Sequence, residues 1–124
     1  MKITSFNPLI LSRHQEDIVG LFEAMGFEKR HVKAEIEGKE HTNIRMKDAN
    51  GFYVDVASTN SVPQDMTSIR INVDDFDEAL DFFLSRGFIN VREDDSIEIG
   101  SSRDTYLISP SGFAITLIQH IRKS

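Results

Sequence analysis

The sequence repeats itself at one fixed spacing. Gly26-Phe27 recurs 61 residues later as Gly87-Phe88, and Gly51-Phe52 recurs as Gly112-Phe113. The same spacing also matches Ile10 with Ile71, Phe22 with Phe83, and Ile36-Glu37 with Ile97-Glu98. A repeat without a gap indicates two copies of one supersecondary unit, each about half of the 124 residues. We therefore treat equivalent positions in the two copies as parts of one candidate site.

The first copy has the pattern of a β-α-β-β-β unit. Strands are predicted over 3–11, 27–36, 41–47 and 52–57. Ser12 is the predicted N-cap of the helix, with Gln15 completing a capping box. Gly26 fits the position just after a helix, where a positive φ is common, and Asn50-Gly51 indicates a hairpin turn.

The second copy follows the same order. Its predicted strands are 67–73, 88–92, 96–99, 103–108 and 113–119. Asp74 is the predicted helix cap, Gly87 ends the helix, and the polar segment 58–66 links the copies. The predicted fold class is α+β: two tandem modules, each a four-stranded mixed sheet with one helix, forming a curved cleft. We expect a single domain over 1–124, with modules of about 1–58 and 67–121.

Strand alternation separates a helix-covered face from an uncovered face. The seven phenylalanines assigned to the core are Phe22, Phe27, Phe52, Phe82, Phe83, Phe88 and Phe113. The uncovered faces are predicted to be polar and to line a hydrated small-molecule cleft. Their candidate ligand-binding residues are Asn7, Arg45, Tyr53, Asp55, Ser68, Arg70, Tyr106 and Thr116.

Composition excludes several classes of function. A net charge of −6 with scattered basic residues argues against nucleic acid as a partner. No apolar run approaches the roughly 20 residues of a membrane span, so we expect no membrane partner. The chain has no cysteine, which removes disulfides, thiolate metal sites and a cysteine nucleophile. With no signal-peptide pattern at the start, the expected location is the cytoplasm.

The paired β-α-β-β-β units, their helix-to-Gly-Phe junctions and their two turns together resemble one known family. The turns are Asp48-Ala49-Asn50-Gly51 and Ser109-Pro110-Ser111-Gly112. Over essentially its whole length the chain resembles the vicinal oxygen chelate superfamily, which includes glyoxalases, bleomycin-resistance proteins and extradiol dioxygenases. The resemblance implies the same fold, and it implies a homodimer.

The resemblance also implies a position for a metal. Family enzymes hold a divalent metal at four positions, which correspond here to Asn7, Asp55, Ser68 and Thr116. A register slip of one residue would replace Asn7 by Pro8 and Ser68 by Ile69. Asp55 alone is an ordinary ligand for a divalent transition metal, so we predict no metal at this set.

The remaining charged residues leave alternatives open. Asp55 is either a site carboxylate or the partner of Arg45 or Arg70, and the two arginines either clamp an anionic ligand or face solvent. Tyr53 and Tyr106 either stack on a flat ligand or pack as walls. His31 and His41 could meet across a hairpin as a metal pair, although exposed polar residues are the simpler interpretation; His14 and His120 lie apart from them in the sequence.

Two functions from different classes follow. The first is a metal-free small-molecule-binding protein of the glyoxalase/bleomycin-resistance type, without a cofactor, whose ligand lies in the cleft between the modules. The second is an enzyme of the same superfamily, a lyase, isomerase or dioxygenase with one divalent metal at a non-standard site. A regulatory or partner-binding module is a third possibility, because a fold does not fix a function.

Overall fold

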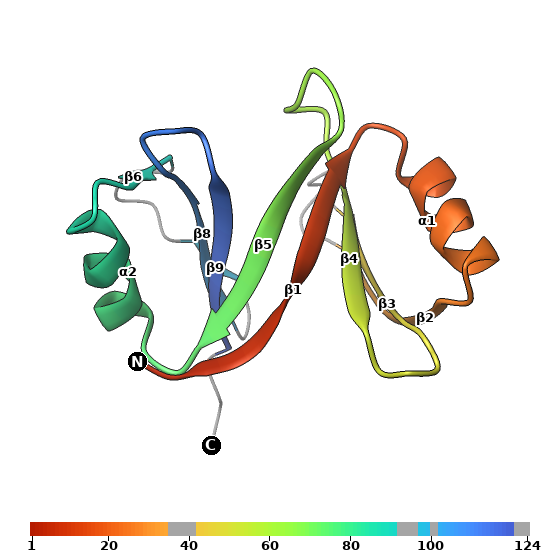
Figure 1. Ribbon diagram of the computed structural model, residues 1–124, viewed down its shortest axis with the longest axis horizontal. Helices are drawn as coiled ribbons and strands as arrows, with labels where there is room; N and C mark the ends of the chain where they lie inside the picture. Colours follow the sequence, from red (N-terminus) through yellow and green to blue (C-terminus); the bar gives the residue numbers. More distant parts are fainter. Residues whose placement is uncertain (35–41, 92–96, 100–101, 121–124) are drawn as a thin grey trace. The chain divides into compact units, whose positions relative to one another are not determined.

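The computed structural model describes residues 1–124 except 35–41, 92–96, 100–101 and 121–124. The chain forms two compact units (Figure 1). We call Asn7–Thr67 the first unit, and Ser68–Ser124 together with Met1–Phe6 the second unit. Each unit has one helix on one side of a mixed sheet, so the predicted α+β class and the tandem modules are confirmed. The predicted cleft and the module boundaries stay predictions.

The first unit contains a sheet with the order β2-β3-β4-β1. Its elements are α1 (Gln15–Ala24), β2 (Glu28–Ala34), β3 (Thr42–Lys47), β4 (Tyr53–Ser58) and β1 (Ile3–Ser12) from Asn7 onward. Strand β4 is antiparallel to β3 and parallel to β1, with Leu9 opposite Asp55. The strand β4 therefore lies between two partners, and its side chains have neighbours on both sides.

The second unit contains a sheet with the order β5-β9-β8-β6, and β7 also pairs with β8. Its elements are β5 (Met66–Val73) from Ser68 onward, α2 (Phe76–Leu84), β6 (Ile89–Asn90), β7 (Ile97–Ile99), β8 (Ser102–Ile108) and β9 (Ala114–His120). Strands β5 and β9 are parallel, whereas the pairs with β8 are antiparallel. Here β6 and β7 together take the place that β2 has in the first unit.

The alternation predicted for the strands is confirmed by the two apolar cores. In the first unit, Val54 and Val56 of β4 pack with Met46 and with Val19 of α1. In the second unit, alternate residues of β5 and β9 pack against α2. The buried residues of this core, from β5, α2, β8 and β9, are Ile71, Val73, Phe76, Ala79, Leu107, Ile115 and Leu117. One side of each sheet is thereby closed by its helix.

The assignment of seven phenylalanines to the core is partly wrong. Phe22, Phe27, Phe83 and Phe88 pack against the cores. Phe52 is 66% exposed and Phe113 is 51% exposed, and Phe82 is exposed too. Phe52 and Phe113 each follow a glycine with positive φ and precede the first ladder residue of β4 or β9, so they lie outside the alternation. Phe76, absent from that assignment, is completely buried.

The start of α1 differs from the prediction. The helix begins at Gln15, and His14 occupies the N-cap position without a side-chain cap. The Ser12 hydroxyl accepts a hydrogen bond from the His14 amide at 2.8 Å and donates to Asp65 at 2.7 Å. The Gln15 amide donates to the Val56 carbonyl at 2.8 Å. Ser12 therefore links β1 to the segment after β4 by a hydrogen bond. It does not form the predicted capping box.

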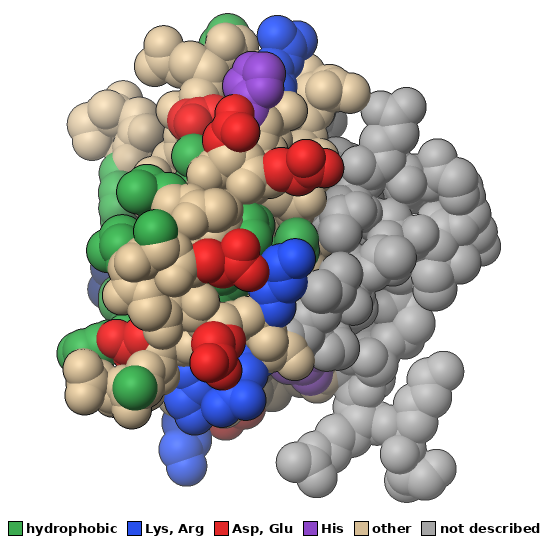
Figure 2. All heavy atoms as spheres, turned by 90° about the vertical axis from the view of Figure 1, so that its right-hand side faces the viewer, with side chains coloured by type: hydrophobic (Ala, Val, Ile, Leu, Met, Phe, Trp, Pro, Cys, Tyr) green, Lys and Arg blue, Asp and Glu red, His purple; other side chains and the backbone are tan. Residues whose placement is uncertain are grey.

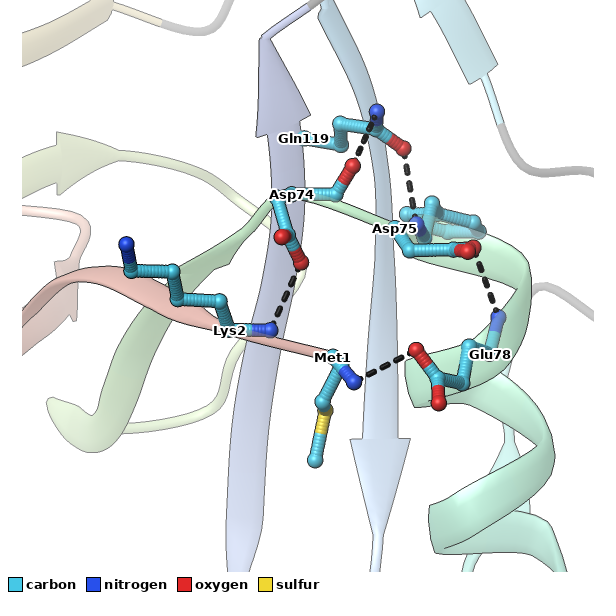
Figure 3. Close-up of polar contacts among 7 residues, drawn as sticks. Met1, Lys2, Asp74, Asp75, Glu78 and Gln119 are labelled. Carbon is cyan, nitrogen blue, oxygen red and sulfur yellow. Dashed lines mark hydrogen bonds and ion pairs between the residues drawn. The ribbon is translucent and has the colours of Figure 1, made fainter.

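The start of α2 also moves by one residue from the prediction (Figure 3). Asp75 is the N-cap and accepts from the Glu78 amide at 3.0 Å. The Asp74 carboxylate instead accepts from the Lys2 backbone N–H at 2.6 Å. Gln119 of β9 closes the turn: its amide donates to the Asp74 carbonyl, and its oxygen accepts from the Phe76 amide. The amino group of Met1 pairs with Glu78, which ties Met1–Phe6 to the second unit.

The side of the first unit that carries α1 has a mixed surface (Figure 2). Acidic side chains are scattered there among apolar ones. The first turn of α1 carries Glu16 and Asp17, while Leu21 and Met25 are exposed near its end. Within the described residues, neither helix is long and apolar enough to cross a membrane.

Replacing Phe76 by alanine should destabilise the protein strongly, because the ring is completely buried in the core of the second unit. We expect Phe76→Ala to lower the free energy of unfolding by about 3–5 kcal/mol. The matched control Phe113→Ala removes an exposed ring and should cost no more than about 1 kcal/mol. Urea denaturation followed by circular dichroism measures both. Equal losses for the two variants would show that the core is assigned wrongly.

Candidate functional site

A partly buried ion pair lies on the face of the first unit that α1 leaves uncovered. Antiparallel pairing places Arg45 of β3 directly opposite Asp55 of β4. Asp55 is 0% exposed, and its Oδ2 accepts a hydrogen bond from Arg45 Nη1 at 3.1 Å. The Arg45 side chain is 21% exposed, so one end of this pair faces outward. The contact makes Arg45 one partner of Asp55, as the sequence allowed.

An aromatic ring lies beneath the cations of this face. The Arg45 guanidinium lies 4.2 Å from the centre of the Tyr53 ring, and the Lys47 ammonium lies 5.3 Å from it. Both distances suit a cation–π contact. Tyr53 is opposite Lys47 in the β3–β4 ladder, so the register alone brings these groups together. Lys47 is two residues from Arg45 on β3 and so shares its face, and it is absent from the candidate residues predicted from the sequence.

Asn7 completes the cluster around Asp55. Its amide nitrogen donates to Asp55 Oδ2 at 2.9 Å and to the Pro8 carbonyl at 2.8 Å. Asn7 is 3% exposed, and its Oδ1 is buried without a hydrogen-bond partner among the described residues. Because Asn7 points to Asp55, the register slip that would put Pro8 in this position does not occur. We call Asn7, Arg45, Tyr53 and Asp55 the Asp55 cluster.

The second unit brings its own predicted residues onto one face. The hydroxyls of Ser68 on β5 and Thr116 on β9 lie 2.9 Å apart, which rules out the slip to Ile69. Arg70 is opposite Thr116 in the β5–β9 ladder, and its Nε donates to Asn72 Oδ1 at 3.1 Å. Tyr106 of β8 is opposite Thr116 from the other side. Thr116 thus lies between Arg70 and Tyr106 in the sheet.

The phenol of Tyr106 is in an unusual environment. Its hydroxyl is buried and has no hydrogen-bond partner in the part of the chain that the structure describes. Burial raises the pKa of the Tyr106 phenol above its ordinary value, because the tyrosinate would lose its hydration. A buried hydroxyl with no partner costs free energy, and a ligand group or a water molecule would relieve that cost.

The histidine pair suggested by the sequence stays a prediction, because it falls partly outside the described residues. His31 of β2 is opposite Arg45 in the β2–β3 ladder. His41 lies outside the described residues. Among the residues that the structure describes, no group of three or more His, Cys, Asp or Glu side chains is arranged to hold a metal ion.

The four positions that the resemblance assigns to a divalent metal do not fit one. Asp55 is the single carboxylate of the set, and its Oδ2 already accepts from a guanidinium and an amide. A guanidinium 3.1 Å from that oxygen repels a second cation. The Ser68 and Thr116 hydroxyls bond to each other and are weak neutral ligands. An organic cation therefore neutralises the carboxylate at this position.

Purified protein should not retain a metal at Asp55, because the Arg45 guanidinium competes for the carboxylate. We expect well below one metal per chain by elemental mass spectrometry of protein prepared without chelator. Adding Ni²⁺, Zn²⁺, Mn²⁺ or Fe²⁺ should raise the melting temperature of the wild type no more than that of Asp55→Ala. About one metal per chain, lost in Asp55→Ala, would contradict the ion-pair assignment.

The pKa of Tyr106 should be measurably high. The chain has two tyrosines and no tryptophan, so Tyr53→Phe leaves Tyr106 as the sole absorbing phenol near 295 nm. We expect its titration midpoint above that of N-acetyltyrosinamide, which is about 10. Because folding raises the pKa of Tyr106, the neutral phenol adds to the free energy of unfolding relative to the tyrosinate. This contribution is complete below the pKa of the unfolded chain and is lost as the pH rises through the pKa of the folded protein. A midpoint at the reference value would mean that Tyr106 is hydrated.

Comparisons with known proteins agree on the fold. A scan against protein-family models found no match, and a search of curated proteins found none either. Solved structures of similar fold include the methylmalonyl-CoA epimerase from Mycobacterium tuberculosis, with a TM-score of 0.72 and 11% sequence identity. That alignment covers 97% of this chain and 90% of the epimerase.

Two further structures agree over nearly the whole chain. A variant of the Streptomyces coelicolor methylmalonyl-CoA epimerase, in complex with 2-nitronate-propionyl-CoA, has a TM-score of 0.69 and 16% identity, covering 98% of this chain and 100% of the epimerase. A hypothetical protein from Bacillus halodurans C-125 has a TM-score of 0.70 and 9% identity, covering 98% of this chain and 99% of its own. The chain therefore has the fold of the vicinal oxygen chelate superfamily, as its sequence predicted.

Proposed function

We propose that this protein is a metal-free small-molecule-binding protein of the glyoxalase/bleomycin-resistance type. The observation that carries the proposal is the contact between the buried Asp55 carboxylate and Arg45. At the position that the resemblance gives to a metal ligand, the carboxylate is bonded to an arginine. A permanent cation on the protein thereby takes the place that a metal ion would need.

Arg45 is the proposed anchor for an anionic group of the ligand. A guanidinium carries five N–H donors in one plane, and this geometry matches a carboxylate or a phosphate. Tyr53 below it is a rigid wall, and Lys47 on the same face adds a second positive charge. Among the described residues of this face, two cations, Arg45 and Lys47, lie near one carboxylate, Asp55. An anionic ligand is therefore favoured over a cationic one.

The second unit would offer hydroxyl groups and one further cation. Ser68 and Arg70 are buried on β5; Thr116 of β9 is opposite Arg70, and Tyr106 of β8 is opposite Thr116. The Tyr106 hydroxyl, buried without a described partner, suits a hydrogen bond to a ligand oxygen. Placement of the ligand in a cleft between the modules, and pairing of the chain as a homodimer, stay predictions from the sequence and the resemblance.

An isomerase is the second candidate function, and the fold comparison favours it. Solved structures with this fold include methylmalonyl-CoA epimerase in complex with methylmalonyl-CoA and NH4+, matched over 96% of this chain. An enzyme of that kind, or a lyase or dioxygenase, would use one divalent metal at a non-standard site, and its turnover would depend on Asp55. The ion pair favours the binding protein, because Oδ2 of the Asp55 carboxylate already accepts two hydrogen bonds, one of them from a permanent cation.

Removing the Arg45 guanidinium should weaken binding of anionic aromatic molecules. We would use benzoate as the probe and follow it by ¹H–¹⁵N correlation spectra of the labelled protein. We expect benzoate to shift signals of the Asp55 cluster, and Arg45→Ala to weaken its affinity by roughly tenfold or more. The affinity of Arg45→Lys for benzoate should lie between those of the wild type and Arg45→Ala, because an ammonium keeps the charge but loses the planar donors.

Arg86→Ala is the matched control, since it removes an arginine that contacts Phe82 of the second unit. Its affinity for benzoate should equal that of the wild type. If Arg45→Ala binds benzoate as well as the wild type does, Arg45 is not the anchor. If benzoate shifts no signal of the Asp55 cluster at tens of millimolar, the proposed binding face itself is wrong.

A further inference from the structure

The amide of Asn7 has a fixed orientation. Its nitrogen donates to two acceptors, the Asp55 carboxylate and the Pro8 carbonyl, and a flipped amide would set oxygen against oxygen at both contacts. The Asn7 Oδ1 atom must therefore point away from Asp55. That oxygen is buried, and no described residue donates to it. Because a buried acceptor without a donor is costly, it is an exception that requires a physical explanation.

The unpartnered oxygen lies close to the proposed anchor. Asn7 Nδ2 and Arg45 Nη1 both donate to the same atom, Asp55 Oδ2, at 2.9 and 3.1 Å. These two nitrogens are therefore no more than about 6 Å apart, the sum of the two bond lengths. A small molecule whose anionic group meets Arg45 thus comes within reach of the Asn7 amide.

We infer that the ligand carries a hydrogen-bond donor, an N–H or O–H group, near its anionic group, and that this donor binds Asn7 Oδ1. The inference rests on the proposed function and narrows the ligand to a class: N-acylamino or hydroxy carboxylates and related oxyanions. An analogue without the donor leaves the Asn7 oxygen buried and unbonded, and such a site rejects it. Asn7 is thereby the specificity-determining residue beside the anchor Arg45.

Asn43 provides a matched comparison on the same strand as Arg45. Its Oδ1 is likewise buried without a hydrogen-bond partner among the described residues. It is opposite Ala57, one step along the uncovered face from the Arg45–Asp55 pair. The contacts to Asp55 Oδ2 come from Asn7 and Arg45, and they place Asn7 beside the anchor. Removing the Asn43 amide therefore tests whether another buried oxygen without a described partner on this face also selects ligands that carry a hydrogen-bond donor.

The experiment compares two probes that differ in a single donor. N-acetylglycine has a carboxylate and an N–H group, whereas N-acetylsarcosine has a methyl group in place of that hydrogen. Their affinities for the wild type, Asn7→Ala and Asn43→Ala are measured by titration in ¹H–¹⁵N correlation spectra. Glycolate and methoxyacetate form a second pair, which differs in an O–H group. Unchanged spectra away from the Asp55 cluster establish that each variant is folded.

We expect the wild type to bind N-acetylglycine roughly tenfold more tightly than N-acetylsarcosine. The preference should fall to about twofold or less in Asn7→Ala and persist in Asn43→Ala. Equal affinity of both probes, with signals of Arg45 shifted by both, overturns the inference and leaves the proposed function standing. A failure of both probes and of benzoate to shift the Asp55 cluster overturns the proposed function and the inference together. If Asn7→Ala does not fold, the wild type alone decides: the inference stands if it prefers the donor-bearing probe in both pairs of probes, and it fails if it does not.

Discussion

The alternation of side chains along β4 is the constraint on which the first unit depends. Val54, Asp55 and Val56 are three consecutive buried residues. Two of them enter the apolar core beneath α1, and the period of two turns the carboxylate between them to the opposite side. A buried carboxylate needs a cation or several donors, since an isolated charge in a low dielectric is very costly. The neighbouring strands supply both, through Arg45 on β3 and Asn7 on β1.

The Asp55 pair connects packing to function. A carboxylate that is already bonded to a guanidinium is poorly suited to hold a metal ion, while the exposed end of Arg45 is suited to an oxyanion. The fold is shared with epimerases at 11–16% sequence identity, so the chemistry must be argued from the residues present. The second unit has hydroxyls at the equivalent positions, where Ser68 and Thr116 satisfy each other. The two copies of the repeat have therefore kept one fold and diverged at the site.

Local signals in the sequence predicted most elements because each has a local physical cause. Glycines with positive φ at Gly26 and Gly87 end the helices as expected, and the strand boundaries agree to within a few residues. The predicted helix caps are wrong where a residue distant in the sequence binds the side chain that was expected to cap the helix. Asp74 has the residue type of a helix cap, but the Lys2 backbone N–H binds its carboxylate, and Asp75 takes the cap. Ser12 likewise bonds to Asp65, far along the chain, and caps no helix.

The sequence by itself determined the repeat, the α+β units and the set of polar residues on the uncovered faces, because these follow from spacing and from a period of two. Only the tertiary structure decided that Arg45 holds Asp55 and that the Asn7 oxygen has no described donor. Those facts depend on the register of β3 and β1 against β4, which one-dimensional patterns leave free. The exposure of Phe52 and the burial of Phe76 were decided in the same way, by what the neighbouring elements cover.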